Sequence, residues 1–137
     1  MTAVSREALA RGYATYLESG DDSVFDLFSP DFFDNVSGQR GLEIFRTVGR
    51  WLDETFAERG VDVHAAMSDG DRVMLWLTLH ATHTGNGFPR LVDLPVSGKK
   101  IDWPQVHMFR LADGLVVEHW AVRDDAGLLD QIASTSA

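Results

Sequence analysis

The spacing of apolar residues changes once along this chain, and that change constrains the fold more than any other feature. In the first 60 residues apolar side chains recur every three or four positions, as at Leu9, Tyr13 and Tyr16. Between residues 61 and 122 they recur at every second position. The first spacing is typical of helices and the second of strands. Helices followed by strands predict an α+β domain in which helices cover one face of an antiparallel sheet.

Capping residues predict where the helices begin and end. Ser5 can cap a first helix and Gly20 can end it, and a short second helix is expected directly afterwards. A third helix is predicted over residues 41–59, with Gly60 as its stop. The Asp-Asp pair at 124–125 can cap a last short helix.

Two hairpins are expected in the second half of the chain. The first covers residues 61–81 with a turn at 68–71, and its positions 73, 75, 77, 79 and 81 share one apolar face. The second covers residues 101–122 and turns at Asp113-Gly114. Residues 85–98 form the loop between them.

The register of the second hairpin decides which polar groups face the core. We favour a three-residue loop, because Asp-Gly after an apolar and a small residue suits a type I turn followed by a left-handed glycine. His107 then pairs with His119, on a face made of Gln105, His107, Phe109, Val117, His119 and Ala121. A two-residue turn would instead place His107 opposite Trp120. Two imidazoles on an apolar face can transfer protons near neutral pH.

Composition limits the ligands that such a domain can bind. The 137 residues suffice for a single domain, residues 1–137, with its own core. The formal net charge is −9, and Lys99 and Lys100 are the only lysines, so nucleic acid is not an expected partner. There are no cysteines, which excludes disulfides and thiolate chemistry. No apolar run is long enough to cross a membrane and no secretory pattern is visible, so a cytoplasmic location is expected.

Motifs for metals and phosphates are weak. His80 and His83 are three positions apart on a strand and therefore point to opposite faces, so no metal site is expected. The Gly85-Asn86-Gly87 segment lacks the lysine and the helix of a phosphate loop.

Several short motifs together resemble one known family. They are QVHMFR at 105–110, DG at 113–114, VEHW at 117–120, DD at 124–125 and GLL at 127–129 with Gln131. Weaker agreement upstream comes from PDF at 30–32 with Asn35, GDRV at 70–73, THTG at 82–85, and LP at 94–95 with GK at 98–99. Over residues 13–131 the chain resembles the SnoaL-like polyketide (ester) cyclases of the nuclear transport factor 2-like superfamily.

The resemblance implies a fold and an assembly. It implies a cone-shaped barrel, in which a strongly curved antiparallel sheet is covered by the N-terminal helices around a deep apolar pocket. It also implies a homodimer packed through the outer sheet faces, where Val106, Met108 and Trp120 would lie.

The resemblance also implies a reaction. Such cyclases close a ring by intramolecular aldol condensation, using acid/base catalysis without a metal or cofactor, on a hydrophobic, oxygenated intermediate of secondary metabolism. His107 and His119 match histidines of the family signature. The family's acid/base aspartate falls at Ala121, so another carboxylate, Asp124 or Asp34, would have to take its place.

Substrate-binding residues are expected around these groups. Asn35, beside Asp34, aligns with a polar pair of the family that lines the pocket, and aromatic residues would hold a flat ligand. The expected set is Asn35, Tyr16, Trp51, Phe88, Trp103, Gln105, Phe109 and Ala121.

Two alternatives remain open. One is a different reaction on the same scaffold, such as epoxide opening or isomerisation, for which Arg110 and Arg123 are available. The other is a non-catalytic small-molecule-binding module, which the alanine at position 121 favours.

Overall fold

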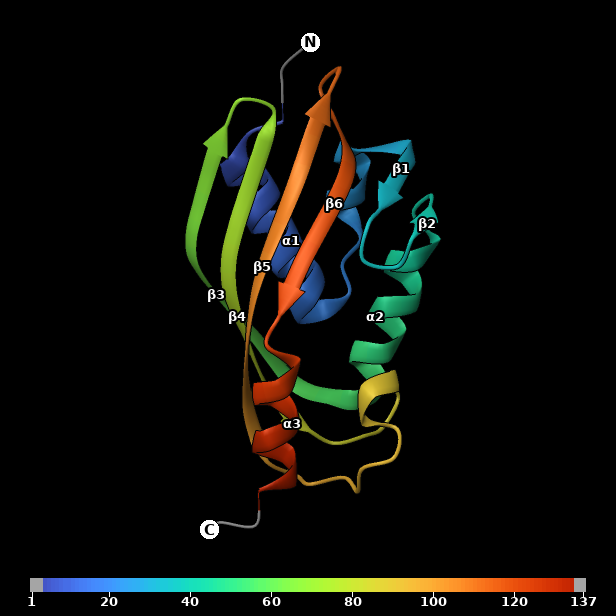
Figure 1. Ribbon diagram of the computed structural model, residues 1–137, viewed down its shortest axis with the longest axis vertical. Coiled ribbons are helices and arrows are strands. Elements are labelled where there is room, and N and C mark those ends of the chain that lie inside the picture. The colour runs from blue at the N-terminus through green and yellow to red at the C-terminus, as the bar shows by residue number, and fades with distance from the viewer. Residues whose placement is uncertain (1–3, 135–137) are drawn as a thin grey trace.

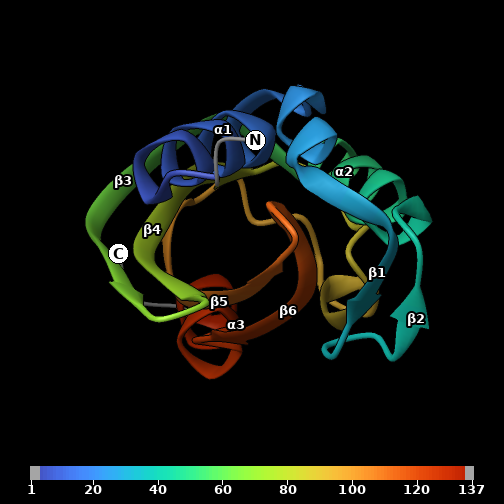
Figure 2. The same cartoon turned by 90° about the horizontal axis from the view of Figure 1, so that it is seen from above.

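One curved sheet forms the wall of the molecule, and two helices lie along its open side (Figures 1 and 2). The computed structural model describes residues 4–134. The sheet has six strands in the order β2-β1-β6-β5-β4-β3. It curves without closing into a barrel, and α1 packs against β3 and β4. The predicted α+β class and the curved, helix-covered sheet are confirmed.

The first helix follows the capping prediction. α1 (Arg6–Ser19) begins after Ser5, whose hydroxyl accepts a hydrogen bond from the Ala8 amide at 3.0 Å. It ends at Gly20, which adopts a left-handed φ of 80°. A short 3-10 helix, η1 (Ser23–Leu27), leads into β1 (Phe28–Asp34) and then into the two-residue strand β2 (Gln39–Arg40).

The predicted end of the third helix is wrong. α2 (Glu43–Thr55) stops before residue 59, and β3 (Phe56–Asp69) begins at once, so Gly60 lies inside a strand. Phe56 pairs with His83 of the neighbouring strand and is only 2% exposed. Burial of that ring and the new backbone hydrogen bonds outweigh the local helical pattern.

The first hairpin is confirmed. β3 pairs with β4 (Arg72–His83), and the alternate residues of β4 on the core-facing side are buried: Val73, Leu75, Leu77, Leu79 and Ala81. A loop with one 3-10 turn, η2 (Pro89–Leu91), then leads to β5 (Lys100–Ala112).

The predicted partners in the second hairpin are wrong, although the predicted face of the two histidines is right. β5 and β6 (Leu115–Arg123) join through a two-residue turn, since Ala112 pairs with Leu115. A bulge next to Arg110 then shifts the register by one, which leaves His107 opposite Ala121 and neither His119 nor Trp120. Each shift turns the strand over, and two shifts restore the original face.

The same bulge changes one core residue. Val116, expected on the outer face, is fully buried, whereas Val117, expected inside, is half-buried.

Two features complete the fold. β1 runs parallel to β6, although an antiparallel sheet was expected throughout. α3 (Asp125–Ala133) closes the sequence of elements, and the Asp124 carboxylate caps it by accepting a hydrogen bond from the Gly127 amide at 2.9 Å. Among residues 4–134, no helix is long and apolar enough to span a membrane.

Candidate active site

A chain of hydrogen bonds joins four polar side chains on the inner face of the sheet. Asp34 Oδ1 lies 2.9 Å from His119 Nδ1, and His119 Nε2 lies 2.9 Å from His107 Nδ1. His107 Nε2 in turn lies 2.7 Å from Oε1 of Gln105. We call these four residues the relay.

Strand pairing brings the relay together. Asp34 is the last residue of β1 and is the direct partner of His119 on β6, because these two strands run parallel at this point. The β5–β6 register sets His107 opposite Ala121 and His119 opposite Phe109, so the two imidazoles are diagonal neighbours on one face. The relay therefore depends on contacts between segments more than 80 residues apart.

Aromatic rings enclose the two histidines. The ring of Tyr13, from α1, lies 4.8 Å from the ring of His107, centroid to centroid. The ring of Phe109 stacks on that of His119 at 5.0 Å, and the ring of Phe45 lies 6.0 Å from the same imidazole. His107 is 1% exposed and His119 is 2% exposed, so the relay is shielded from bulk water.

Burial and hydrogen bonding set the charges of the relay. Burial, together with the nearby charges of His119 and Arg123, holds the pKa of His107 well below its ordinary value of 6.5. Burial also lowers the pKa of His119, and the hydrogen bond to Asp34 opposes this only in part. Burial alone would raise the pKa of Asp34, but hydrogen bonds from His119 and Ser37 outweigh it, and the net pKa is lowered. At neutral pH the carboxylate is therefore ionised and both imidazoles are neutral.

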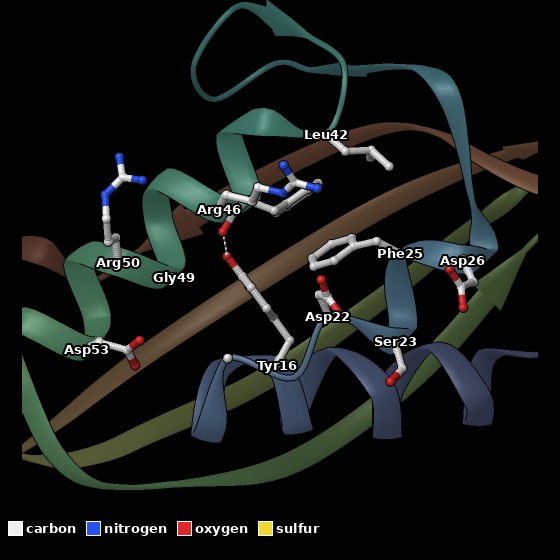
Figure 3. Close-up of a pocket in the computed structure, with 12 residues that line it drawn as sticks. Tyr16, Asp22, Ser23, Phe25, Asp26, Leu42, Arg46, Gly49, Arg50 and Asp53 are labelled. Atoms are coloured by element: carbon white, nitrogen blue, oxygen red, sulfur yellow. Dashed lines mark hydrogen bonds between the residues drawn. The ribbon is translucent and has the colours of Figure 1, made fainter.

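A pocket of about 490 Å³ lies between α1, η1 and α2, and none of the four relay residues lines it (Figure 3). Tyr16 reaches across it from α1 and donates a hydrogen bond to the carbonyl of Phe45 at 2.5 Å. Its lining mixes apolar with charged side chains: Tyr16, Gly20, Asp22, Ser23, Phe25, Asp26, Leu42, Phe45, Arg46, Gly49, Arg50 and Asp53. The lining is mixed because α2 contributes Arg46 and Arg50, and the segment that faces it contributes Asp22 and Asp26.

The structure separates the two candidate carboxylates. Asp34 is buried and hydrogen-bonded to His119, whereas Asp124 is exposed and caps α3. Asn35 does not join the relay: it is exposed, and its side-chain amide contacts Glu118 Oε2 and the carbonyl of His119.

The expected aromatic residues form a second group. The ring of Trp51 contacts Phe88 at 6.0 Å, and Phe88 contacts Trp103 at 5.3 Å, centroid to centroid. Trp103 is buried, and its indole N–H donates to the carboxylate of Asp125 at 3.1 Å. These rings are packed together as part of the core, as Phe109 is.

One residue of the site was not assigned to it from the sequence. Tyr13 touches both imidazoles, but its place in the apolar stripe of α1 gave no sign of this. Among residues 4–134, no group of three or more His, Asp or Glu side chains is arranged to hold a metal ion.

A family model for SnoaL-like polyketide cyclases matches residues 7–132, which is nearly the whole chain. The chain belongs to this family. The nogalonic acid methyl ester cyclase of Streptomyces nogalater is 27% identical to it over 81% of this chain and 84% of that protein. The aklanonic acid methyl ester cyclase DnrD of Streptomyces peucetius is 27% identical over 78% of this chain and 72% of its own length.

Solved structures agree on the fold of this SnoaL-like protein. TsrD from Streptomyces laurentii superposes with a TM-score of 0.81 at 22% identity, covering 95% of this chain and 98% of TsrD. IdmH from Streptomyces antibioticus gives a TM-score of 0.74 at 21% identity, covering 96% of this chain and all of IdmH.

Proposed function

We propose that this SnoaL-like protein is an acid/base catalyst that closes a ring in a hydrophobic, oxygenated substrate by an intramolecular aldol-type reaction. The observation that carries the proposal is the buried relay from Asp34 to Gln105, which links a carboxylate to two imidazoles in an apolar surrounding. Its relatives are named as methyl ester cyclases, which supports a ketone-bearing methyl ester as the substrate class.

The proton count of the relay favours a base. With Asp34 ionised and both imidazoles neutral, the two rings hold two N–H protons, whereas three hydrogen bonds join the four residues. His119 Nδ1 donates to the carboxylate, and Gln105 presents an oxygen, so Nε2 of His107 must donate there. The contact between the two rings then lacks a proton. When a substrate displaces the Gln105 amide, the proton of His107 can lie at Nδ1 instead and complete this contact, which leaves Nε2 free to accept a proton from the substrate.

The reaction follows from this count. In this tautomer the neutral imidazole of His107 carries its proton at Nδ1, facing His119, and removes a proton next to a substrate carbonyl with its free Nε2. The proton at Nδ1 passes to His119, and the proton on His119 moves towards Asp34. The resulting enolate attacks a second carbonyl carbon, so one C–C bond forms. The relay then returns its proton to the new alkoxide, and the product has the same atoms as the substrate.

The carboxylate of Asp34 takes the place of the missing one at Ala121. It lies at the far end of the relay and acts through His119, fixing the tautomer and stabilising positive charge on the pair. Asp34 is therefore a positioning residue, and His107 is the group that would touch the substrate.

The test uses an uncyclised aromatic methyl ester with a reactive ketone, with product formation followed by chromatography. His107→Ala should lower the rate by about 10²–10⁴-fold. Asp34→Asn should lower it less and shift the pH–rate profile, because it changes the proton affinity of His119. His80→Ala is the matched control, since His80 lies exposed on β4 and outside the relay.

Two results would oppose the proposal. Normal turnover by His107→Ala would show that His107 is not the base. Binding by tryptophan quenching without conversion in the unchanged protein would favour the binding module instead. Epoxide opening through Arg110 is not supported, because that arginine pairs with Glu118 at 2.6 Å, on the outer face of the sheet.

We further propose that two copies pack through the outer sheet face. Several apolar side chains of that face are exposed, among them Trp76 at 50% and Val106 at 37%. Met108 and Trp120, beside them on the paired strands, are half-buried. A second copy of this chain would cover this surface, and sedimentation velocity would detect the dimer directly.

A further inference from the structure

Arg123 is a cation on the inner face of the sheet, next to the relay. It is the last residue of β6 and is the direct partner of Gln105, two positions beyond Ala121. Its guanidinium carbon lies 5.9 Å from the ring centre of Trp103, a buried core residue, which fixes its direction as inward. Four inner positions therefore form a square, with Gln105 and His107 on one strand and Ala121 and Arg123 on the other.

No carboxylate in the part of the chain that the structure describes pairs with this arginine. Within residues 4–134 the guanidinium of Arg123 makes no hydrogen bond and no ion pair, and it lies over the indole ring of Trp103. The two acids that follow it in sequence are engaged elsewhere. Asp124 caps α3, and Asp125 accepts from the Trp103 indole and pairs with Arg90 at 3.1 Å.

Ala121 leaves space beside this charge. Its methyl group stands between His119 and Arg123 on the same strand and directly opposite His107. A longer acidic residue at position 121 would meet the guanidinium and cancel its charge. Ala121 and Arg123 lie opposite His107 and Gln105 on the same inner face, so a ligand over Ala121 would lie between the imidazole and the arginine.

We propose that Arg123, Ala121 and His107 form a subsite for a negatively charged oxygen of the ligand, either a carboxylate or an enolate oxygen. The inference rests on the proposed function, which creates an enolate next to His107. The planar guanidinium binds such an oxygen through its N–H groups, and Ala121 provides the room for it. Arg123 is thereby a substrate-contacting residue that stabilises the charge created when the α-proton is removed.

The electrostatics of the neighbouring groups agree with this placement. The positive charge of Arg123 adds to the effect of burial in lowering the pKa of His107, and it acts in the same direction on His119. It also opposes the rise that burial causes in the pKa of Tyr13. The cation therefore acts on the interior where the relay and Tyr13 lie.

The experiment compares two flat probes that differ in charge. Anthraquinone-2-carboxylate and its neutral carboxamide are titrated into the protein at pH 8, and binding is followed by quenching of tryptophan fluorescence. The carboxylate should bind at least about tenfold more tightly than the carboxamide, as one charge-assisted hydrogen bond would provide. Arg123→Gln should remove this preference.

Matched controls separate the subsite from general charge effects. Arg72→Gln removes an arginine that also lies over an indole, that of Trp120 at 5.5 Å, but belongs to the other side of the sheet, and it should keep the preference. Ala121→Asp should abolish the preference, because the new carboxylate pairs with Arg123, whereas Ala121→Asn should retain it. Thermal melting checks that each variant is folded, and Ala121→Asp tests the same subsite without removing the arginine.

Measurements of turnover distinguish the two possible anions, a carboxylate of the ligand and the enolate oxygen. If Arg123→Gln loses the carboxylate preference but cyclises normally, the subsite holds a carboxylate of the ligand. If it also loses at least about tenfold in kcat, the subsite holds the enolate oxygen.

The proposal is overturned in three cases. These are equal binding of the two probes to the unchanged protein, no binding of either probe, and a carboxylate preference that survives Arg123→Gln. Cyclisation that depends on His107 but occurs without any preference for the carboxylate would disprove the subsite alone and leave the proposed function standing.

Discussion

The two buried imidazoles should make the stability of this protein sensitive to mild acid. His107 stays neutral in the folded state because burial lowers its pKa well below 6.5, whereas the same residue in the unfolded chain binds a proton near that pH. The unfolded state therefore binds more protons, and the free energy of unfolding falls as the pH drops below about 6.5. Between pH 7.0 and 5.5 the loss is about 1.3 kcal/mol for His107, and up to about the same again for His119.

Urea denaturation at pH 7.0, 6.25 and 5.5, followed by tryptophan fluorescence, measures this loss. His107→Gln keeps a neutral polar side chain at the site and should reduce the loss by about 1.3 kcal/mol over the interval. Asp34 contributes little in this window, because its lowered pKa affects stability only below its ordinary value of 3.8.

One exposed group acts in the opposite direction and serves as the internal control. The pKa of His80 is raised by the hydrogen bonds that it donates to Asp102 and Asp62, so its contribution to stability is present at low pH and is lost as pH rises. It is retained in both proteins and cancels from their difference. An equal loss in the unchanged protein and in His107→Gln would refute the assignment of His107 as a buried neutral imidazole.

Four other sites in the fold give predictions about stability and assembly. Gly85→Ala should destabilise the protein by about 2–3 kcal/mol, because its Cβ would lie 1.9 Å from the carbonyl oxygen of Glu54. Gly60→Ala has open space and should change stability by less than about 0.5 kcal/mol, so equal urea midpoints for the two variants would contradict this reasoning. Phe109→Ala should cost about 3–5 kcal/mol by the same measurement, since the ring is fully buried, and a loss below about 1 kcal/mol would mean that the core refills the site. Trp76→Glu should convert the proposed dimer to a monomer in sedimentation velocity at an unchanged melting temperature, and a variant that remains dimeric would place the contact elsewhere.

Local patterns were sufficient to predict most elements of the fold. The change of period gave the helices, both hairpins and the buried face of β4, because burial on a strand depends only on alternation. The end of α2 could not be predicted in this way. Residues 56–60 are helical in pattern, but they pair with β4, a contact that no neighbouring residue specifies.

In the second hairpin, the predicted face of the two histidines is correct although their predicted cross-strand partners are wrong. The turn contains two residues with positive φ, Asp113 at 52° and Gly114 at 79°, which fits a two-residue loop. The bulge beside Arg110 then adds a residue to β6. Either event alone would have placed the two histidines on opposite faces of the hairpin, and the pattern of alternation indicates their common face without indicating either event.

The carboxylate that lies next to His119 could not be predicted from the sequence, for a different reason. Asp34 and Asp124 both remain candidates from the sequence, because the distance from Asp34 to His119 depends on how β1 enters the sheet. The parallel pairing of β1 with β6 settles this geometry by placing Asp34 directly opposite His119. Because β1 is short and its alternation is weak, nothing in its residues specifies a partner strand or a direction.

The burial of the relay places a condition on how a substrate reaches it. His107 Nδ1 is occupied by His119, and Nε2 faces Gln105, so a ligand must displace the Gln105 amide or accept its hydrogen bond in turn. The Tyr13 ring covers the same imidazole from the helical side. In the proposed subsite, a ligand that lies over Ala121 would also meet Arg123, which is two positions further along β6 on the same face. Under the proposed function, Ala121 supplies no acid beside His107, and the carboxylate that is joined to the pair of histidines is Asp34, at 2.9 Å from His119.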